Sequence, residues 1–127
     1  MTVRVFAHER ANGRCPYEDF LAEVEASGDE VGHAKIRAYV QKLREKGYSL
    51  ALEGRLAENL KGEDGLCELK PKPYRVFYYH DEKEQAHVLL NGYRKRSNDT
   101  PKGVMREAKK LMTEHRNWTK GGTNAPQ

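Results

Sequence analysis

The stretch from Leu66 to Pro101, LCELKPKPYRVFYYHDEKEQAHVLLNGYRKRSNDTP, decides the fold of this chain. It contains three short strand-like segments, 66–70, 74–80 and 86–93, separated by a proline-containing break and by a polar turn. β-branched and aromatic residues favour strands, whereas proline and short polar clusters interrupt them. The stretch is therefore predicted to form three consecutive antiparallel strands, a β-meander.

Charged and aromatic side chains of this meander are expected to gather on one face. Successive side chains of a strand point to opposite sides of a sheet, so Glu68 and Lys70 share one face of the first strand. By the same parity Arg75 lies with the aromatic residues Phe77 and Tyr79 of the second strand. The third strand then runs directly into cations, Tyr93-Arg94-Lys95-Arg96. A carboxylate, several cations and exposed aromatic rings on one side of a small sheet would suit a phosphodiester ligand.

Outside the meander, one further strand and several helices are predicted. Residues 2–8 alternate apolar and polar side chains, which indicates a strand. Apolar residues recur at helical spacing behind capping or helix-starting residues in 16–27, 29–46 and 100–116, and residues 50–60 indicate a short helical turn. The predicted fold is α+β: a four-stranded, largely antiparallel sheet made of the N-terminal strand and the meander, with an N-terminal helical hairpin and a C-terminal helix. The helices are expected to cover one face and to leave the other for ligands.

Length and composition indicate one small domain. A chain of 127 residues with 37% hydrophobic content can bury one modest core. We expect the domain to span residues 1–118. Residues 119–127 contain glycine, asparagine and proline and are expected to form a flexible tail.

The positive charge is concentrated in the second half of the chain. The formal net charge is +4 and the sequence pI is about 9.1. Residues 61–127 carry fourteen Lys and Arg against nine Asp and Glu, whereas residues 1–60 carry nine against ten. This gradient favours a polyanion such as nucleic acid, or an acidic protein, as the partner.

Cysteine usage and hydropathy indicate a soluble protein of the reducing cytoplasm. Cys15 and Cys67 form no close pair, and neither they nor the five histidines have the spacing of a zinc motif. No metal or other cofactor is therefore expected. The N-terminus lacks an apolar signal core, and no segment approaches the roughly 20 apolar residues of a membrane span.

The order of elements and five local motifs resemble the RelE/ParE superfamily of toxins, and within it the phage-derived HigB-like branch. The resemblance covers about residues 3–116, and its motifs are Asn59-Leu60-Lys61, Leu66–Lys70, Tyr74–Tyr78, Leu89–Lys95 and Thr100-Pro101. It implies a type II toxin that cleaves messenger RNA on the ribosome without a metal ion. It also implies a cognate antitoxin, a HigA-like helix-turn-helix protein, that forms a hetero-oligomer with the toxin and neutralises it.

Metal-free RNA cleavage needs a base for the 2′-hydroxyl proton, cations for the scissile phosphate and a proton donor for the leaving oxygen. Arg75 is the candidate phosphate clamp, because a guanidinium is planar and stays charged, and it matches the arginine of RelE-type toxins. Lys70 matches one of two lysines that RelE places on the preceding strand. Glu68 stands where the other lysine would be, so it is either the general base or a structural partner of Lys70 or Arg75.

The end of the meander supplies the remaining candidates. Arg94 and Lys95 match the basic pair of the family, and Tyr93 could stack on a base or donate a proton. His80 and His87 are not at the catalytic histidine position of YoeB-like relatives. The C-terminal catalytic tyrosine of RelE has no counterpart, so the general acid is unassigned. Further RNA contacts are expected from seven basic residues, some of which an antitoxin could cover instead: Lys61, Lys72, Arg96, Lys102, Arg106, Lys109 and Lys110.

Two other functions remain open on the sequence. A ParE-like protein would inhibit DNA gyrase by binding, without chemistry, although such proteins generally lack the cations at positions 70, 75, 94 and 95. A catalytically inactive phage or prophage regulator of the same fold would retain only its protein partner.

Overall fold

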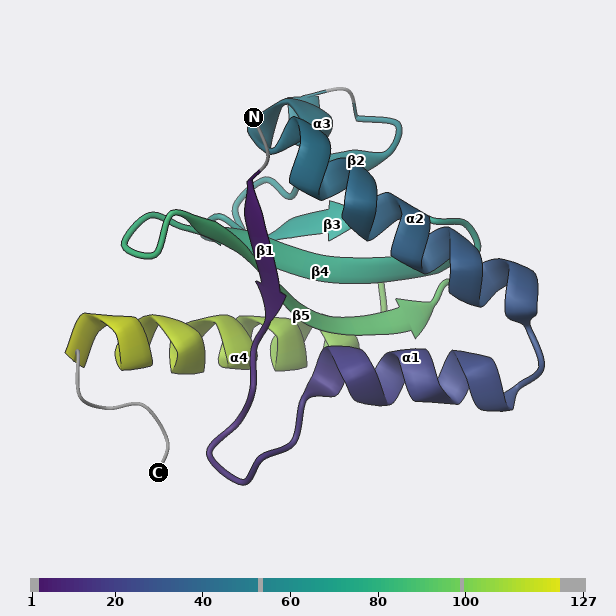
Figure 1. Ribbon diagram of the computed structural model, residues 1–127, viewed down its shortest axis with the longest axis horizontal. Coiled ribbons are helices and arrows are strands. Elements are labelled where there is room, and N and C mark those ends of the chain that lie inside the picture. The colour runs from purple at the N-terminus through teal and green to yellow at the C-terminus, as the bar shows by residue number, and fades with distance from the viewer. Residues whose placement is uncertain (1–2, 53, 99, 122–127) are drawn as a thin grey trace.

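A computed structural model describes residues 3–52, 54–98 and 100–121. Helices surround a central sheet, and the strands of the predicted meander lie side by side within it (Figure 1). In chain order the elements are β1 (Arg4–Ala7), α1 (Pro16–Ala26), α2 (Glu30–Lys46), α3 (Tyr48–Leu52), β2 (Ala57–Asn59), β3 (Cys67–Leu69), β4 (Tyr74–Asp81), β5 (Ala86–Arg94) and α4 (Lys102–Gly121). The helical hairpin, the meander and the C-terminal helix are thus confirmed.

The sheet has five strands in the order β1-β5-β4-β3-β2, which corrects the prediction of four. β1 joins the meander as expected, but it runs parallel to β5, so the sheet is mixed. The extra strand is β2, which pairs antiparallel with β3. Leucines spaced by four in residues 50–60 indicated a helical turn there. Helix α3 ends at Leu52, however, and Ala57–Asn59 instead cover the edge of β3, which would otherwise expose unpaired backbone groups.

Helices cover both faces of the sheet, so the expectation of one open face was wrong. One core cluster packs Val76 and Tyr78 of β4 against α1 and α2. A second cluster packs Phe77 and Tyr79 of β4 against α4. The apolar stripe of α4 explains the difference, because these side chains leave water only by packing on the second face of the sheet.

An irregularity in the pairing of β4 and β5 changes which residues of β5 face α4. Val76 pairs with Gly92, whereas Tyr78 pairs with Leu89, so more residues of β5 than of β4 lie between the two pairs. Such a bulge reverses the alternation of side chains beyond it. Close packing requires glycine at position 92, because a Cβ there would lie 2.5 Å from the Phe20 ring.

The C-terminal helix is longer than the sequence indicated. It continues to Gly121, past the expected start of the tail at residue 119, and residues 122–127 lie outside the described part of the chain. Across residues 3–52, 54–98 and 100–121, no helix has the length and hydropathy needed to cross a membrane.

His87 of β5 makes folding stability depend on pH. Its side chain is almost fully buried beside the rings of Tyr78 and His80. Burial, and secondarily the neighbouring His80, lowers the pKa of His87 from 6.5 to about 4. The unfolded chain therefore takes up a proton near pH 6.5 that the folded chain accepts only near pH 4. Stability is highest above pH 6.5 and falls as the pH drops between these values.

We expect the free energy of unfolding to fall by about 2 kcal/mol between pH 7.5 and pH 4.5 through this residue. Urea denaturation followed by circular dichroism at both pH values measures the change. His87→Gln should show a smaller fall, whereas His33→Gln on the surface of α2 is the matched control. An equal fall in wild type and His87→Gln would contradict the assignment.

Candidate functional site

The candidate site lies on the α4 face of the meander, next to the start of α4. Three neighbouring strands contribute to it: Glu68 from β3, Arg75 from β4 and Tyr93 from β5. Arg75 pairs with Tyr93 across β4 and β5, and Glu68 pairs with Phe77 across β3 and β4. The predicted shared face of Glu68 and Arg75 is therefore confirmed.

Arg75 and Glu68 form a largely buried ion pair. Arg75 Nε lies 3.5 Å from Glu68 Oε1, and their side chains are only 9% and 7% exposed. Arg75 Nη1 also donates a hydrogen bond to the Tyr74 carbonyl at 3.1 Å. Burying two charges costs free energy that their mutual attraction only partly returns. Such a pair is therefore weak evidence for a stabilising role.

Arg75 is not sealed inside the protein, because it lines a shallow surface hollow. Three more cations line the same hollow, Lys72, Lys95 and Arg96. The rest of the lining comes from Pro73, Ser97 and Asn98. We call this feature the cationic hollow. Its open side and its four positive charges suit one phosphate group or a short segment of a nucleic-acid backbone.

Two opposing influences act on the charge of Glu68: burial, which disfavours the carboxylate, and neighbouring cations, which favour it. Burial raises the pKa of the Glu68 carboxyl above its ordinary value of 4.5, and Arg75, Lys95 and Lys70 oppose the rise. A carboxylate with a raised pKa is better matched to accepting a proton near neutral pH than an exposed one. Glu68 is therefore a stronger base than an exposed carboxylate would be.

Tyr93 supports the carboxylate rather than offering a stacking surface. Its hydroxyl donates to Glu68 Oε2 at 3.4 Å and lies 3.3 Å from Thr100 Oγ1. Its ring is 8% exposed and stacks on Phe77 with the ring centres 5.7 Å apart. Burial raises the pKa of Tyr93, so the phenol stays protonated and acts as a donor. A raised pKa makes Tyr93 a weaker acid, so its role as a proton donor stays a prediction, and base stacking would require the ring to leave the core.

Two of the predicted catalytic cations are held away from the hollow. Lys70 pairs with Glu58 of β2 and donates to the Gly54 carbonyl at 2.9 Å. Arg94 turns to the opposite face of the sheet, where its guanidinium lies 5.6 Å from the centre of the Tyr74 ring. For Arg94 the β5 bulge is the cause, because it places Tyr93 on the α4 face and the next residue, Arg94, on the other.

The predicted RNA-binding residues are distributed unevenly. Lys72 and Arg96 line the cationic hollow, and Lys95 Nζ donates to the Asn98 carbonyl at its rim. Lys109 pairs with Glu63. The remaining predicted contacts are exposed on the surface, at Lys61, Lys102, Arg106 and Lys110.

Sequence reasoning missed Thr100 as a hydrogen-bond partner of Tyr93. Thr100-Pro101 gave a clear helix-start signal, and the observed α4 begins directly after it. That signal predicted local structure only. The contact with Tyr93 depends on how the start of α4 packs on β5, which no local pattern encodes.

One group of three potential metal ligands occurs in the described part of the chain. It consists of Asp81, Glu84 and His115, and Asp81 stands at the opposite end of β4 from Arg75. The group is therefore separate from the cationic hollow, and it was not anticipated from sequence spacing.

Comparison with known proteins assigns the family. A family model described as "Phage derived protein Gp49-like (DUF891)" matches residues 23–113, from within α1 to within α4. No curated protein matches the chain. Gp49-like proteins fall within the RelE/ParE-like toxin superfamily and are usually parts of toxin–antitoxin systems. The match spans well over half of the chain and includes all the strands of the candidate site, so this protein belongs to the phage-derived, toxin-like Gp49-like family.

Proposed function

We propose that this protein is a type II toxin of the HigB/RelE kind, which cleaves messenger RNA on the ribosome and so stops translation. The observation that carries the proposal is Arg75, which lines the cationic hollow and pairs with the buried carboxylate of Glu68. A paired arginine and carboxylate beside Lys95 supply the charges that metal-free RNA cleavage requires. Membership of a toxin-like family supports the same reading.

The proposed reaction is an in-line attack of the ribose 2′-oxygen on the adjacent phosphorus. Glu68 accepts the 2′-hydroxyl proton, the 2′-oxygen bonds to phosphorus, and the bond from phosphorus to the 5′-oxygen breaks. The products are a 2′,3′-cyclic phosphate and a free 5′-hydroxyl. Arg75 and Lys95 stabilise the negative charge that builds on the phosphate oxygens. Tyr93 keeps Glu68 in place by donating its phenolic hydrogen bond to the carboxylate. The leaving 5′-oxygen takes a proton from a water molecule, and Glu68 then releases the proton of the 2′-hydroxyl to solvent.

A cognate antitoxin completes the proposal. Members of this family are usually found in toxin–antitoxin systems. We propose a HigA-like helix-turn-helix antitoxin that binds the toxin as a hetero-oligomer in the cytoplasm, where the ribosomes are. Acidic segments of such a partner would suit the basic surface of the second half of the chain.

Arg75→Gln should lower messenger-RNA cleavage by about 100-fold or more, because it removes one charge that stabilises the transition state. The measurement is mapping of transcript ends by primer extension in a translation extract. Lys95→Ala, which changes a more exposed cation of the same hollow, should also lower cleavage. Arg37→Gln on the far side of the sheet is the matched control. Arg94→Gln should retain most activity because its guanidinium lies on the opposite face.

Circular dichroism should show a native-like fold for each variant before cleavage is compared. A folded Arg75→Gln variant with wild-type cleavage would remove Arg75 from the mechanism. Gyrase-linked DNA breaks on induction, with messenger RNA intact, would instead show a ParE-like gyrase inhibitor.

The cleavage rate should rise with pH as Glu68 loses its proton. Because burial raises the pKa of Glu68, the acid limb of the profile should have its midpoint above pH 4.5. Single-turnover cleavage of ribosome-bound messenger RNA between pH 5.5 and pH 8 measures this limb. Glu68→Gln should lower the rate by roughly 10² to 10⁴ and abolish the limb. An unchanged limb in Glu68→Gln would assign it to another group.

A further inference from the structure

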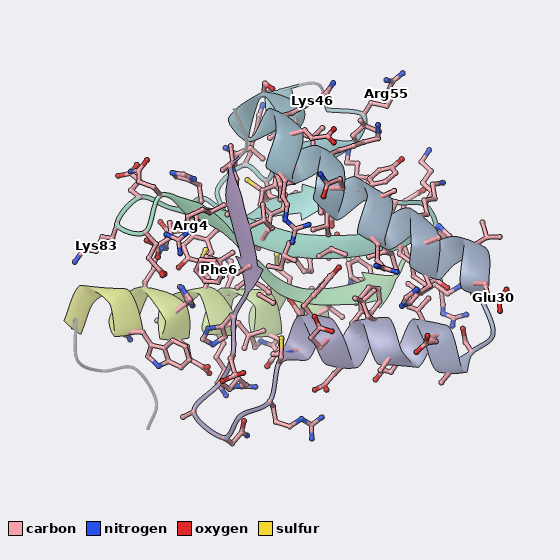
Figure 2. All side chains as sticks on the ribbon, viewed as in Figure 1. Arg4, Phe6, Glu30, Lys46, Arg55 and Lys83 are labelled. Atoms are coloured by element: carbon pink, nitrogen blue, oxygen red, sulfur yellow. The ribbon has the colours of Figure 1, made fainter. Side chains whose placement is uncertain are left out.

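A second group of polar side chains occupies the end of β4 that is remote from the cationic hollow. Asp81 ends β4, Glu84 lies in the turn between β4 and β5, and His115 projects from α4. Figure 2 shows Lys83 at the outer tip of that turn, next to the C-terminal half of α4. Asp81 and His115 are each 4% exposed, so this group is not an ordinary solvated cluster.

The three side chains are close enough to share one ion. One ligand atom from each residue lies within 4.8 Å of the others. His115 Nε2 is 2.6 Å from Glu84 Oε1. Metal–ligand bonds of about 2.0 to 2.2 Å require these two atoms to separate by several tenths of an ångström. Glu84 is on a turn and is 28% exposed, so its side chain has room to make this adjustment.

A hydrogen bond to His8 fixes the orientation of the His115 ring, so that Nε2 faces Glu84. Histidines that bind a metal through one ring nitrogen are commonly held through the other in this way. His115 Nδ1 lies 2.9 Å from His8 Nδ1, and His8 Nε2 lies 3.1 Å from Glu114 Oε1. With an ion on Nε2, neutral His115 carries its one proton on Nδ1 and donates it to His8. His8 then donates from Nε2 to Glu114, which Arg10 fixes through a 2.6 Å hydrogen bond. Every nitrogen of the two rings has a partner in this arrangement, and neither ring needs an additional proton.

The Asp81 carboxylate is also held in place by hydrogen bonds. The Tyr79 hydroxyl donates to Asp81 Oδ2 at 2.9 Å, and the Glu84 backbone N–H donates to Asp81 Oδ1 at 3.0 Å. These donors hold the Asp81 carboxylate in place, and each of its oxygens can accept more than one interaction. Carboxylates that bind a metal ion are commonly held in this way by surrounding hydrogen-bond donors.

We propose that Asp81, Glu84 and His115 bind a first-row divalent cation such as Zn²⁺, which fastens the C-terminal half of α4 to the β4–β5 turn. One imidazole nitrogen with two carboxylates favours Zn²⁺, Co²⁺ or Mn²⁺ over Mg²⁺ and Ca²⁺, which prefer all-oxygen ligands. Water can complete the coordination through the exposed side of Glu84. The site is structural and independent of the proposed RNA cleavage.

Calorimetric titration and thermal unfolding of the full, chelator-treated chain test this site. Zn²⁺ should bind with one ion per chain and raise Tm by several degrees, because an ion that binds only the folded state stabilises it. Co²⁺ should give visible absorption bands of a low-symmetry site, and Mg²⁺ at the same concentration should have little effect.

Glu84→Gln should weaken Zn²⁺ binding at least tenfold, and His8→Gln should weaken it about 10- to 100-fold through loss of the imidazole support. Glu82→Gln, an exposed carboxylate of the same turn, is the matched control and should bind Zn²⁺ as the wild type does. If Zn²⁺ does not raise Tm, the proposal is overturned, and the contact is a simple His115–Glu84 ion pair. Equal Zn²⁺ affinity in wild type and Glu84→Gln would also overturn it, because the ion would then bind elsewhere.

Discussion

Burial of β4 on both faces is the constraint on which this structure depends. Residues 74–79 form one uninterrupted buried run, with alternate side chains packed against the α1–α2 layer and against α4. A strand covered on only one side would alternate apolar and polar residues, whereas this one does not. The consequence is that Arg75, the one cation among residues 74–79, is held beside Glu68 and lines the cationic hollow.

The same constraint links stability to function. A buried ion pair gives little net stabilisation, so an apolar pair would serve the fold as well or better. Arg75 also lines a hollow with three further cations, and it is at this hollow that we propose RNA binds. The opposite end of β4 has a comparable arrangement, in which Asp81 and His115 are buried between the β4–β5 turn and α4. Strand β4 thus carries polar groups at both ends, each supported by residues that are distant in sequence.

Local patterns predicted the elements well and their assembly less well. The helical hairpin, the meander and the shared face of Glu68 and Arg75 followed from spacing and parity alone. The β5 bulge did not, and it moved Arg94 to the other face, because a bulge depends on pairing between strands rather than on the sequence of one strand. Strand β2 and the two-sided burial were missed for a similar reason. The run from Tyr74 to Tyr79, aromatic and apolar apart from Arg75, is the feature that indicates a strand covered on both faces. The expectation of exposed aromatic rings on this strand is therefore wrong.

The central claim is that the Arg75 guanidinium grips a backbone phosphate of RNA at the cationic hollow. The most direct measurement is an NMR titration of the ¹⁵N-labelled protein with an RNA oligonucleotide that carries 2′-O-methyl groups and cannot be cleaved. The account predicts saturable shifts of the Arg75 Nε–H signal and of the backbone amides of residues 95–98, with the Arg94 side chain unaffected. Shifts centred on Arg94, or no change at Arg75 at saturating RNA, would contradict it.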